Sequence, residues 1–307
     1  MAETRPWPAL PLAEWPDTLY NLHRWTQIVG KTALALSPMQ NHWWQVTLHV
    51  TPRGLRTAPL PAQARGLEIE FDFHAPALVI RTDSGERRVL ALEPMTVADF
   101  HARYQALLEE IGVVARFHPA PNEVEPAIPF AEDRTVIAYD AEAARRCARL
   151  LLDVDRVLRA FRSRFLGKCS PVHFWWGAFD IACTRFSGRI APQHPGGFPH
   201  LPDRVTREAY SHECISAGWW PGNVGGPVTE PAFYAYVYPE PAGCPEVKVR
   251  PSAASWHLGL HEWVLPYDAV RLAPDPDAML LEFLESTYDV AARLAAWPRA
   301  ELERRGP

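Results

Sequence analysis

The 307-residue sequence has few cysteines, no long apolar run and no concentration of positive charge. Its five cysteines are an odd number without a C-x-x-C pair, which favours a reducing compartment over a disulfide framework and predicts a cytoplasmic protein. No stretch approaches the ~18 uninterrupted apolar residues of a membrane span, so no membrane association is expected. The first sixteen residues lack a basic run followed by an apolar stretch, so we expect no signal peptide.

The charge and motif content exclude several functional classes. Lysine and arginine number 31 against 36 acidic residues, a formal charge of −5, and the basic residues are scattered, so we expect no nucleic-acid partner. There is no G-x-S-x-G, and the glycines between 218 and 226 lack the Lys-Ser/Thr of a phosphate-binding loop. Histidine, cysteine and acidic residues between 194 and 214 match no standard metal spacing. The sequence therefore predicts neither a cofactor nor a metal.

Proline and tryptophan are abundant instead. The 31 prolines predict many stiff connections, and the 12 tryptophans provide large rigid side chains that are costly to leave in water. With 48% hydrophobic and 22% charged residues, the chain has the composition of a folded globular protein and can bury one large core or two medium ones.

A short pattern occurs twice. The segment 37–44 contains Ser-Pro and then His-Trp-Trp, and the segment 170–176 contains Ser-Pro and then His-Phe-Trp-Trp. Each copy follows a helical pattern and precedes strand-like runs and a closing helix, which indicates an internal duplication. We therefore predict an α+β fold of two pseudo-repeated halves, each built of a helix, mainly antiparallel strands and a helix. The halves should share one large core, with a cleft at the seam between them.

This interpretation sets the domain boundaries. Residues 1–118 form the first pseudo-repeat, 119–133 a stiff proline-rich connection, and 134–307 the second pseudo-repeat. The second contains an insertion, 187–231, which we expect to be an ordered loop packed on the sheet because its Trp, Tyr and His content is wrong for disorder. Helical periodicity is expected from Asp17 to Gly30 or Ser37, and over 97–112, 141–165 and 277–297. Alternation predicts strands over 44–51, 67–73, 77–81, 88–92, 233–238 and 256–265.

Asp180 is the most unusual residue of the second copy. Aligning the two Trp-Trp pairs places it opposite Leu48, at an inward-facing position. A buried carboxylate costs several kcal/mol unless it is paired or hydrogen-bonded. Two explanations stay open: a structural pair, for instance with Arg185 or a backbone cap, or a functional site.

Longer motifs occur at Lys168–Phe174, Phe179–Ala182, Thr184–Arg189, Glu208–Glu213, Glu230–Tyr236 and Leu265–Tyr267. Together they resemble an uncharacterised bacterial protein family of about this length. The resemblance covers nearly the whole chain and implies a family with no assigned function, so it carries over no catalytic residues. At the positions of Cys183 and Cys214 the family pattern has aliphatic or small residues, which argues against a role for these thiols.

The candidate catalytic residues are Asp180, His212 and Glu213. We expect them to converge at a partly buried pocket, where a low dielectric raises the pKa of a carboxyl group and a neighbouring acid supports a protonated histidine. The residues expected to bind the ligand are His173, Trp176, Arg185, Tyr210, Trp220 and Glu230.

Two functions of different class are consistent with these features. The first is a small-molecule binder or enzyme with an aromatic-lined acid/base pocket between the halves. The second is a non-catalytic structural or interaction protein in which the same groups satisfy one another. The location of the tryptophans discriminates between them, because a closed core favours the second function and an open cavity the first.

Overall fold

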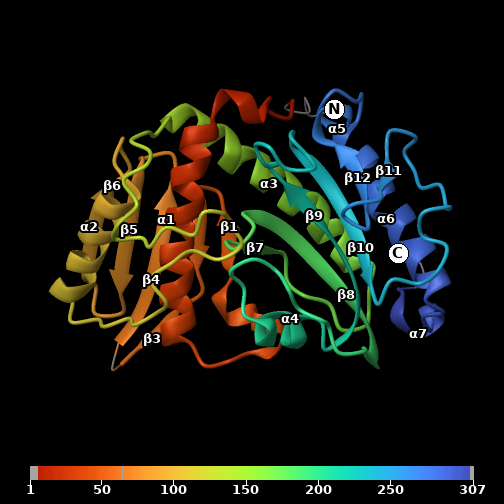
Figure 1. The fold of residues 1–307 in the computed structure, drawn as a ribbon, viewed down its shortest axis with the longest axis horizontal. Coiled ribbons are helices and arrows are strands. Elements are labelled where there is room, and N and C mark those ends of the chain that lie inside the picture. The colour runs from red at the N-terminus through yellow and green to blue at the C-terminus, as the bar shows by residue number, and fades with distance from the viewer. Residues whose placement is uncertain (1–5, 64, 305–307) are drawn as a thin grey trace.

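The computed structural model describes residues 6–63 and 65–304. Its first half begins with a one-turn helix, η1 (Leu12–Glu14), followed by a long helix and a meander of strands that a second helix closes (Figure 1). The elements are α1 (Pro16–Leu36), η2 (Asn41–Val46), β1 (Leu48–Thr51), β2 (Gly54–Thr57), β3 (Leu60–Ala62), β4 (Arg65–Asp72), β5 (Ala77–Thr82), β6 (Arg87–Ala91) and α2 (Val97–Glu110).

The second half repeats the order of helix, strands and helix with more elements. It starts with the 23-residue α3 and ends with α6 and the short α7. The elements are α3 (Ala141–Ser163), β7 (His173–Trp175), β8 (Asp180–Ile190), α4 (Asp203–Ala209), β9 (His212–Trp220), β10 (Ala232–Tyr238), β11 (Ser255–His257), β12 (Glu262–Pro266), α5 (Tyr267–Arg271), α6 (Pro276–Leu294) and α7 (Arg299–Leu302).

All twelve strands belong to one antiparallel sheet. Its order is β11-β12-β10-β9-β8-β7-β1-β2-β4-β5-β6, with β3 paired to β4. The halves join at the centre, where β1 and β7 pair through Leu48 and Phe174. From this junction each half extends outward, so the sheet is continuous from one edge of the molecule to the other.

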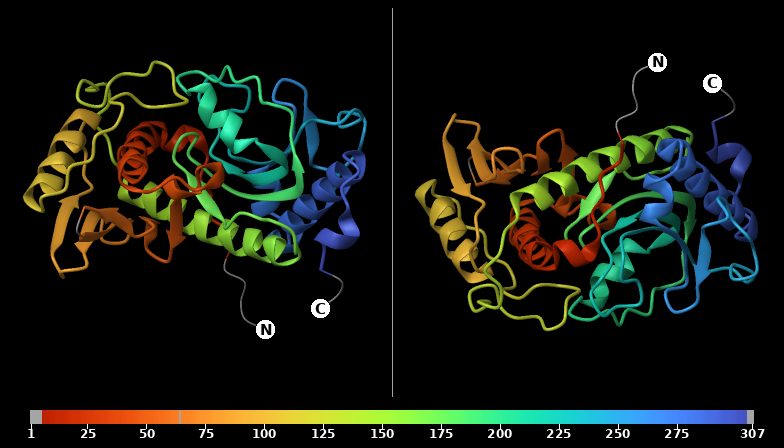
Figure 2. Two further views of the ribbon diagram at one scale, coloured as in Figure 1. Left: turned by 90° about the horizontal axis from the view of Figure 1, so that it is seen from below. Right: turned by 90° about the horizontal axis from the view of Figure 1, so that it is seen from above.

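The helices cover opposite faces of the two halves. Figures 1 and 2 show α1 on the near side of the first-half strands and α3 on the far side of the second half. Trp25 of α1 stacks on Phe100 of α2 with ring centroids 4.8 Å apart, and Phe100 in turn stacks on Phe71 of β4. Behind the second half, α3 packs against α6 and β8. Since α3 and α6 lie behind the second-half strands, the front face of these strands is covered by other segments.

Local signals set the helix ends. Thr96 caps α2 by accepting a hydrogen bond from the backbone N–H of Asp99. Asp140 caps α3 in the same way through two backbone N–H groups. The first helix continues past Gly30 to Leu36 and ends at Ser37, the residue before a proline, where helical angles are disfavoured.

The structure confirms the α+β class, and the predicted helices and most predicted strands are present. Three local expectations were wrong. The segment 256–265 is not one strand, because it forms β11 and β12, which pair with each other as an antiparallel hairpin. The first Trp-Trp pair lies on η2, not on a strand, because His42 and Trp43 have left-handed backbone angles and bond to the second half. The segment 187–231 is not a long loop, since it contains α4 and the central strand β9. The duplication and the domain boundaries stay predictions.

A search of the described helices finds none that is both long and apolar enough to cross a membrane.

The stack of Trp25 on Phe100 predicts a large stability effect. Trp25 is fully buried, so Trp25→Ala should lower the free energy of unfolding by about 3–5 kcal/mol, measured by urea denaturation. Val89→Ala on the outer strand β6 is the control, because Val89 is 43% exposed and its truncation should change stability by less than about 0.5 kcal/mol. Equal losses in both variants would contradict this packing.

Candidate functional site

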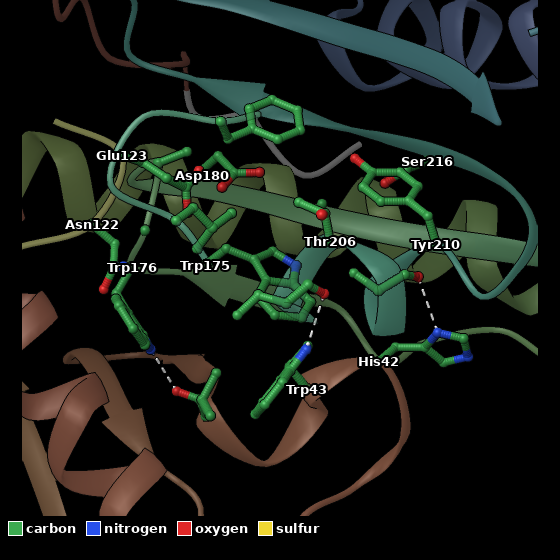
Figure 3. Close-up of a pocket in the computed structure, with 18 of the residues that line it drawn as sticks. His42, Trp43, Asn122, Glu123, Trp175, Trp176, Asp180, Thr206, Tyr210 and Ser216 are labelled. Carbon is green, nitrogen blue, oxygen red and sulfur yellow. Dashed lines mark hydrogen bonds between the residues drawn. The ribbon is translucent and has the colours of Figure 1, made fainter. Parts of the chain in front are cut away.

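A pocket of about 930 Å³ lies in front of the second-half strands, where the two halves meet (Figure 3). The first half contributes α1 and η2, the connection contributes residues 118–123, and the second half contributes β8, β9, β10, β12 and the segment 198–210. Five of the twelve tryptophans line it, together with Tyr210, Tyr234 and Tyr236. They are Trp43, Trp44, Trp175, Trp176 and Trp220.

A polar stripe on α1 fixes two loops of the pocket. His23, Gln27 and Lys31 follow one another at intervals of four residues and therefore share one helix face. His23 Nε2 lies 2.8 Å from the carbonyl oxygen of Gly177, and a carbonyl only accepts, so Nε2 donates. Gln27 donates to the backbone carbonyl of Asn122 at 2.8 Å and accepts from its backbone N–H at 2.7 Å.

Lys31 completes this stripe at the edge of the pocket. Its ammonium group donates to Oδ1 of Asn122 and lies 5.7 Å from the centre of the Trp176 ring. Burial lowers the pKa of Lys31 to about 8. Burial also lowers the pKa of His23 to about 4, which keeps that ring neutral. The loop that bears Glu123 and the turn before Asp180 are thus held by the same helix.

Three carboxyl groups face the pocket. Asp180 begins β8, Glu262 begins β12 and Glu123 follows Asn122 in the connection. Tyr234 donates its hydroxyl proton to Oδ2 of Asp180. An added Cβ at Gly177 would overlap Oε1 of Glu123, so the Glu123 side chain lies directly on the backbone at Gly177. Figure 3 shows the Glu123 and Asp180 side chains beside each other at one end of the pocket.

Burial raises the pKa of all three groups. It raises the pKa of Asp180 to about 7, although the hydrogen bond from Tyr234 acts in the opposite direction. It raises the pKa of Glu262 to about 8, and the charge of Asp180 adds to the effect. Glu123 is an exposed residue of the pocket lining, and desolvation by the surrounding protein together with the charge of Asp180 raises its pKa to about 7. No lysine, arginine or histidine of the described residues forms an ion pair with any of them.

The tyrosines of β10 form the wall beside these carboxyl groups. Tyr234 and Tyr236 alternate along the strand, so both face the pocket, and their rings are stacked 6.2 Å apart. Tyr210 donates to the hydroxyl of Tyr236 at 3.1 Å. On the neighbouring strand, Gly218 makes room for Tyr234, because an added Cβ there would lie 2.8 Å from the Tyr234 hydroxyl. A glycine is therefore required at this close approach.

The opposite wall is η2, bound to the second half by two side chains. His42 Nδ1 donates to the carbonyl oxygen of Ala209 at 3.0 Å, so Nε2 is the free acceptor and receives a hydrogen bond from Lys168 at 2.6 Å. Trp43 donates its ring N–H to the carbonyl oxygen of Val205 at 3.1 Å. Burial and the Lys168 charge lower the pKa of His42. Figure 3 draws the bonds from His42 to Ala209 and from Trp43 to Val205, and both acceptors belong to α4.

The predicted site residues separate into two groups. Asp180, Trp176, Tyr210 and Trp220 line the pocket. His212 does not lie near Asp180, because β8 and β9 are antiparallel and pair Ile181 with Trp219 but Ile190 with His212. The eight residue steps from His212 to Trp220 separate the two ends of β9 by roughly 26 Å. The expected convergence of Asp180 with His212 was therefore wrong.

The other predicted residues have structural contacts elsewhere. Glu213 binds Arg189 at 2.6 Å and Ser187 at 3.0 Å. Glu230 is exposed outside the pocket lining. Arg185 does not pair with Asp180, because the two side chains point to opposite faces of β8; its guanidinium stacks on Phe161 of α3.

His173 is buried between aromatic rings and outside the pocket lining. It lies beside Trp44 and His49, and burial lowers its pKa to about 3. The sequence reasoning missed Glu123, Glu262, Tyr234 and Lys31. Only Tyr234 and Glu262 carried a signal, since each occupies an alternating position of a predicted strand whose other face is buried. Glu123 lies in an irregular segment that has no periodicity.

The free energy of unfolding should decrease as the pH rises, because of Asp180. Its pKa is about 7 in the folded protein against an ordinary 3.8, so the folded state binds this proton more tightly than the unfolded chain. The resulting stabilisation is complete below about pH 4 and is lost as the pH rises through 7. Asp180→Asn cannot ionise and still accepts from Tyr234, so its stability relative to the wild type should increase by about 2–4 kcal/mol between pH 4 and pH 8.5.

Urea denaturation at the two pH values measures this difference. Glu301→Gln at an exposed position of α7 is the control and should follow the wild type at both. A stability difference between Asp180→Asn and the wild type that does not change with pH would contradict the raised pKa.

No curated protein and no solved structure matches the chain. A family model matches residues 7–304, nearly the full length, including both halves and every segment that lines the pocket. The chain belongs to the family of unknown function DUF5996.

Proposed function

We propose that this protein binds a small organic cation, an amine with an apolar body, in the aromatic pocket. One observation carries the proposal: Asp180, Glu123 and Glu262 face the same cavity without a cationic partner among the described residues. Ionising three neighbouring carboxyl groups in a desolvated site is costly. A cationic ligand would supply the missing counter-charge.

The chemistry of the lining supports an organic cation over a metal ion. The described residues contain no group of three histidine, cysteine or acidic side chains placed to hold a metal. Aromatic rings attract cations through their negative faces and also cover apolar groups, so the five tryptophans and Tyr234 suit an ammonium group attached to a hydrocarbon. A volume of about 930 Å³ lies at the upper end of the range for small-molecule sites.

The location of the tryptophans argues against a purely structural role. Trp15, Trp25, Trp219 and Trp263 are in the closed core, as a structural protein would require. Five others surround an open cavity, where large apolar surface stays in contact with water unless a ligand covers it. This distribution favours the small-molecule function over a non-catalytic interaction protein.

A matched set of three ligands tests the proposal. Trp fluorescence should report saturable binding of 4-phenylbutylamine, weaker binding of 4-phenylbutan-1-ol by at least about tenfold, and still weaker binding of 4-phenylbutanoate. The amine should bind more tightly at pH 8 than at pH 6, because the three carboxyl groups lose their protons over this range.

Variants test whether the amine binds beside the carboxyl groups of the pocket. The double variant Asp180→Asn with Glu262→Gln removes two of the charges and should weaken amine binding by about tenfold or more. Glu301→Gln, on the exposed surface of α7, should bind like the wild type. Equal affinities for the amine and the alcohol, or an unchanged affinity in the double variant, would contradict the proposal.

A proton-transfer enzyme is the second candidate. Asp180 and Lys31 line the same pocket with pKa values of about 7 and 8, and a general acid or base works best when its pKa is near the operating pH. Incubating amines with the protein in heavy water and following deuterium entry into their C–H bonds by NMR tests this candidate. Exchange that is abolished in Lys31→Met, with amine binding retained, would support catalysis.

A further inference from the structure

A second hollow, of about 530 Å³, lies on the other side of the sheet near the C-terminal helices. It is lined by the end of α3, the far face of β8, the segment 247–250, α6 and the residues around α7. It shares no lining residue with the aromatic pocket. The two cavities are therefore independent sites.

Positive charge dominates this hollow, although the whole chain carries a net charge of −5. Seven basic and three acidic side chains line it, a local excess of four positive charges. The three acidic residues all pair with arginines of the same lining. Glu285 pairs with Arg164 and Arg185. Asp289 pairs with Arg293 and Arg299, and Glu303 pairs with Arg299. The basic residues are Arg164, Arg185, Lys248, Arg250, Arg293, Arg299 and Arg304.

Arg185 is the buried member of this lining. Its side chain is 1% exposed, and its guanidinium lies 3.4 Å from the centre of the Phe161 ring and 4.3 Å from that of Tyr288. One Nη atom donates to the carbonyl oxygen of Phe161. Its Nε has no hydrogen-bond partner among the described residues, and a carboxylate oxygen of Glu285 lies 3.6 Å from Nη2. A buried guanidinium N–H without an acceptor is costly, so an anion that reached it would be stabilised.

We propose that this hollow binds a phosphate-type oxyanion, as inorganic phosphate or as the phosphoryl group of a small metabolite. Guanidinium groups match the geometry of phosphate oxygens and can donate two parallel hydrogen bonds. Arg185 would contact the anion from the floor of the hollow. Lys248, which is exposed and has no ion pair within the described residues, would close the site from the rim.

Isothermal titration with inorganic phosphate and with pyrophosphate, at constant ionic strength in sodium chloride, tests the site. We expect saturable binding of one ion per chain, tighter for pyrophosphate because it carries more charge. Lys248→Glu should weaken binding at least about tenfold. The matched control is Arg103→Glu, an equal charge reversal at an exposed residue of α2 that pairs with Glu93, and it should change affinity by less than about twofold.

Two further variants separate this site from general attraction and from the aromatic pocket. Glu285→Gln removes the carboxylate beside Arg185 and Arg164 and should strengthen phosphate binding. Asp180→Asn in the aromatic pocket should leave the affinity for phosphate unchanged. The absence of saturable binding, an equal loss in Lys248→Glu and Arg103→Glu, or weaker binding in Glu285→Gln would each overturn the proposal.

Discussion

The pocket depends on the hydrogen bonds that α1 makes with two loops. Gln27 bonds both backbone groups of Asn122, and His23 bonds the carbonyl oxygen of Gly177. Irregular loops carry backbone groups that sheet pairing does not satisfy, so a buried loop needs such partners. Because one rigid helix holds both loops, Glu123 and Asp180 lie together at the end of the cavity. Removing this support would release two of the three carboxyl groups at once.

The two faces of β8 each bear a buried ionisable side chain, Asp180 on one and Arg185 on the other, in different surroundings. Asp180 faces the aromatic pocket, where it accepts from a tyrosine hydroxyl but forms no ion pair with any described residue, and burial raises its pKa. Arg185 faces α3, where aromatic rings and a backbone carbonyl surround it and Glu285 is near. One strand therefore presents an acidic cavity on one side and a basic hollow on the other. Ligands of opposite charge suit the two sites.

Sequence reasoning located one half of the site and missed the other. Asp180 was identified because a carboxylate broke an apolar pattern, and Tyr210 and Trp220 were expected near it. His212 was expected beside Asp180 in one pocket, yet each residue begins its strand, and antiparallel pairing puts the two starts at opposite ends of the strand pair. Glu123 could not be identified from periodicity. It reaches the pocket through contacts between the connection and α1, two segments about 95 residues apart in the chain.

The sequence by itself determined the helices α1, α2, α3 and α6 and most of the strands. Helical spacing, caps such as Thr96 and Asp140, the proline after Ser37 and the alternation in β4 and β10 act between near neighbours, so they are legible without the fold. Only the tertiary structure decided which elements meet. The turn at His42 and Trp43, the insertion of β9 into the sheet and the grouping of Glu123, Asp180 and Glu262 arise from contacts between distant segments. Such contacts depend on packing and burial in the whole molecule, which no local pattern encodes.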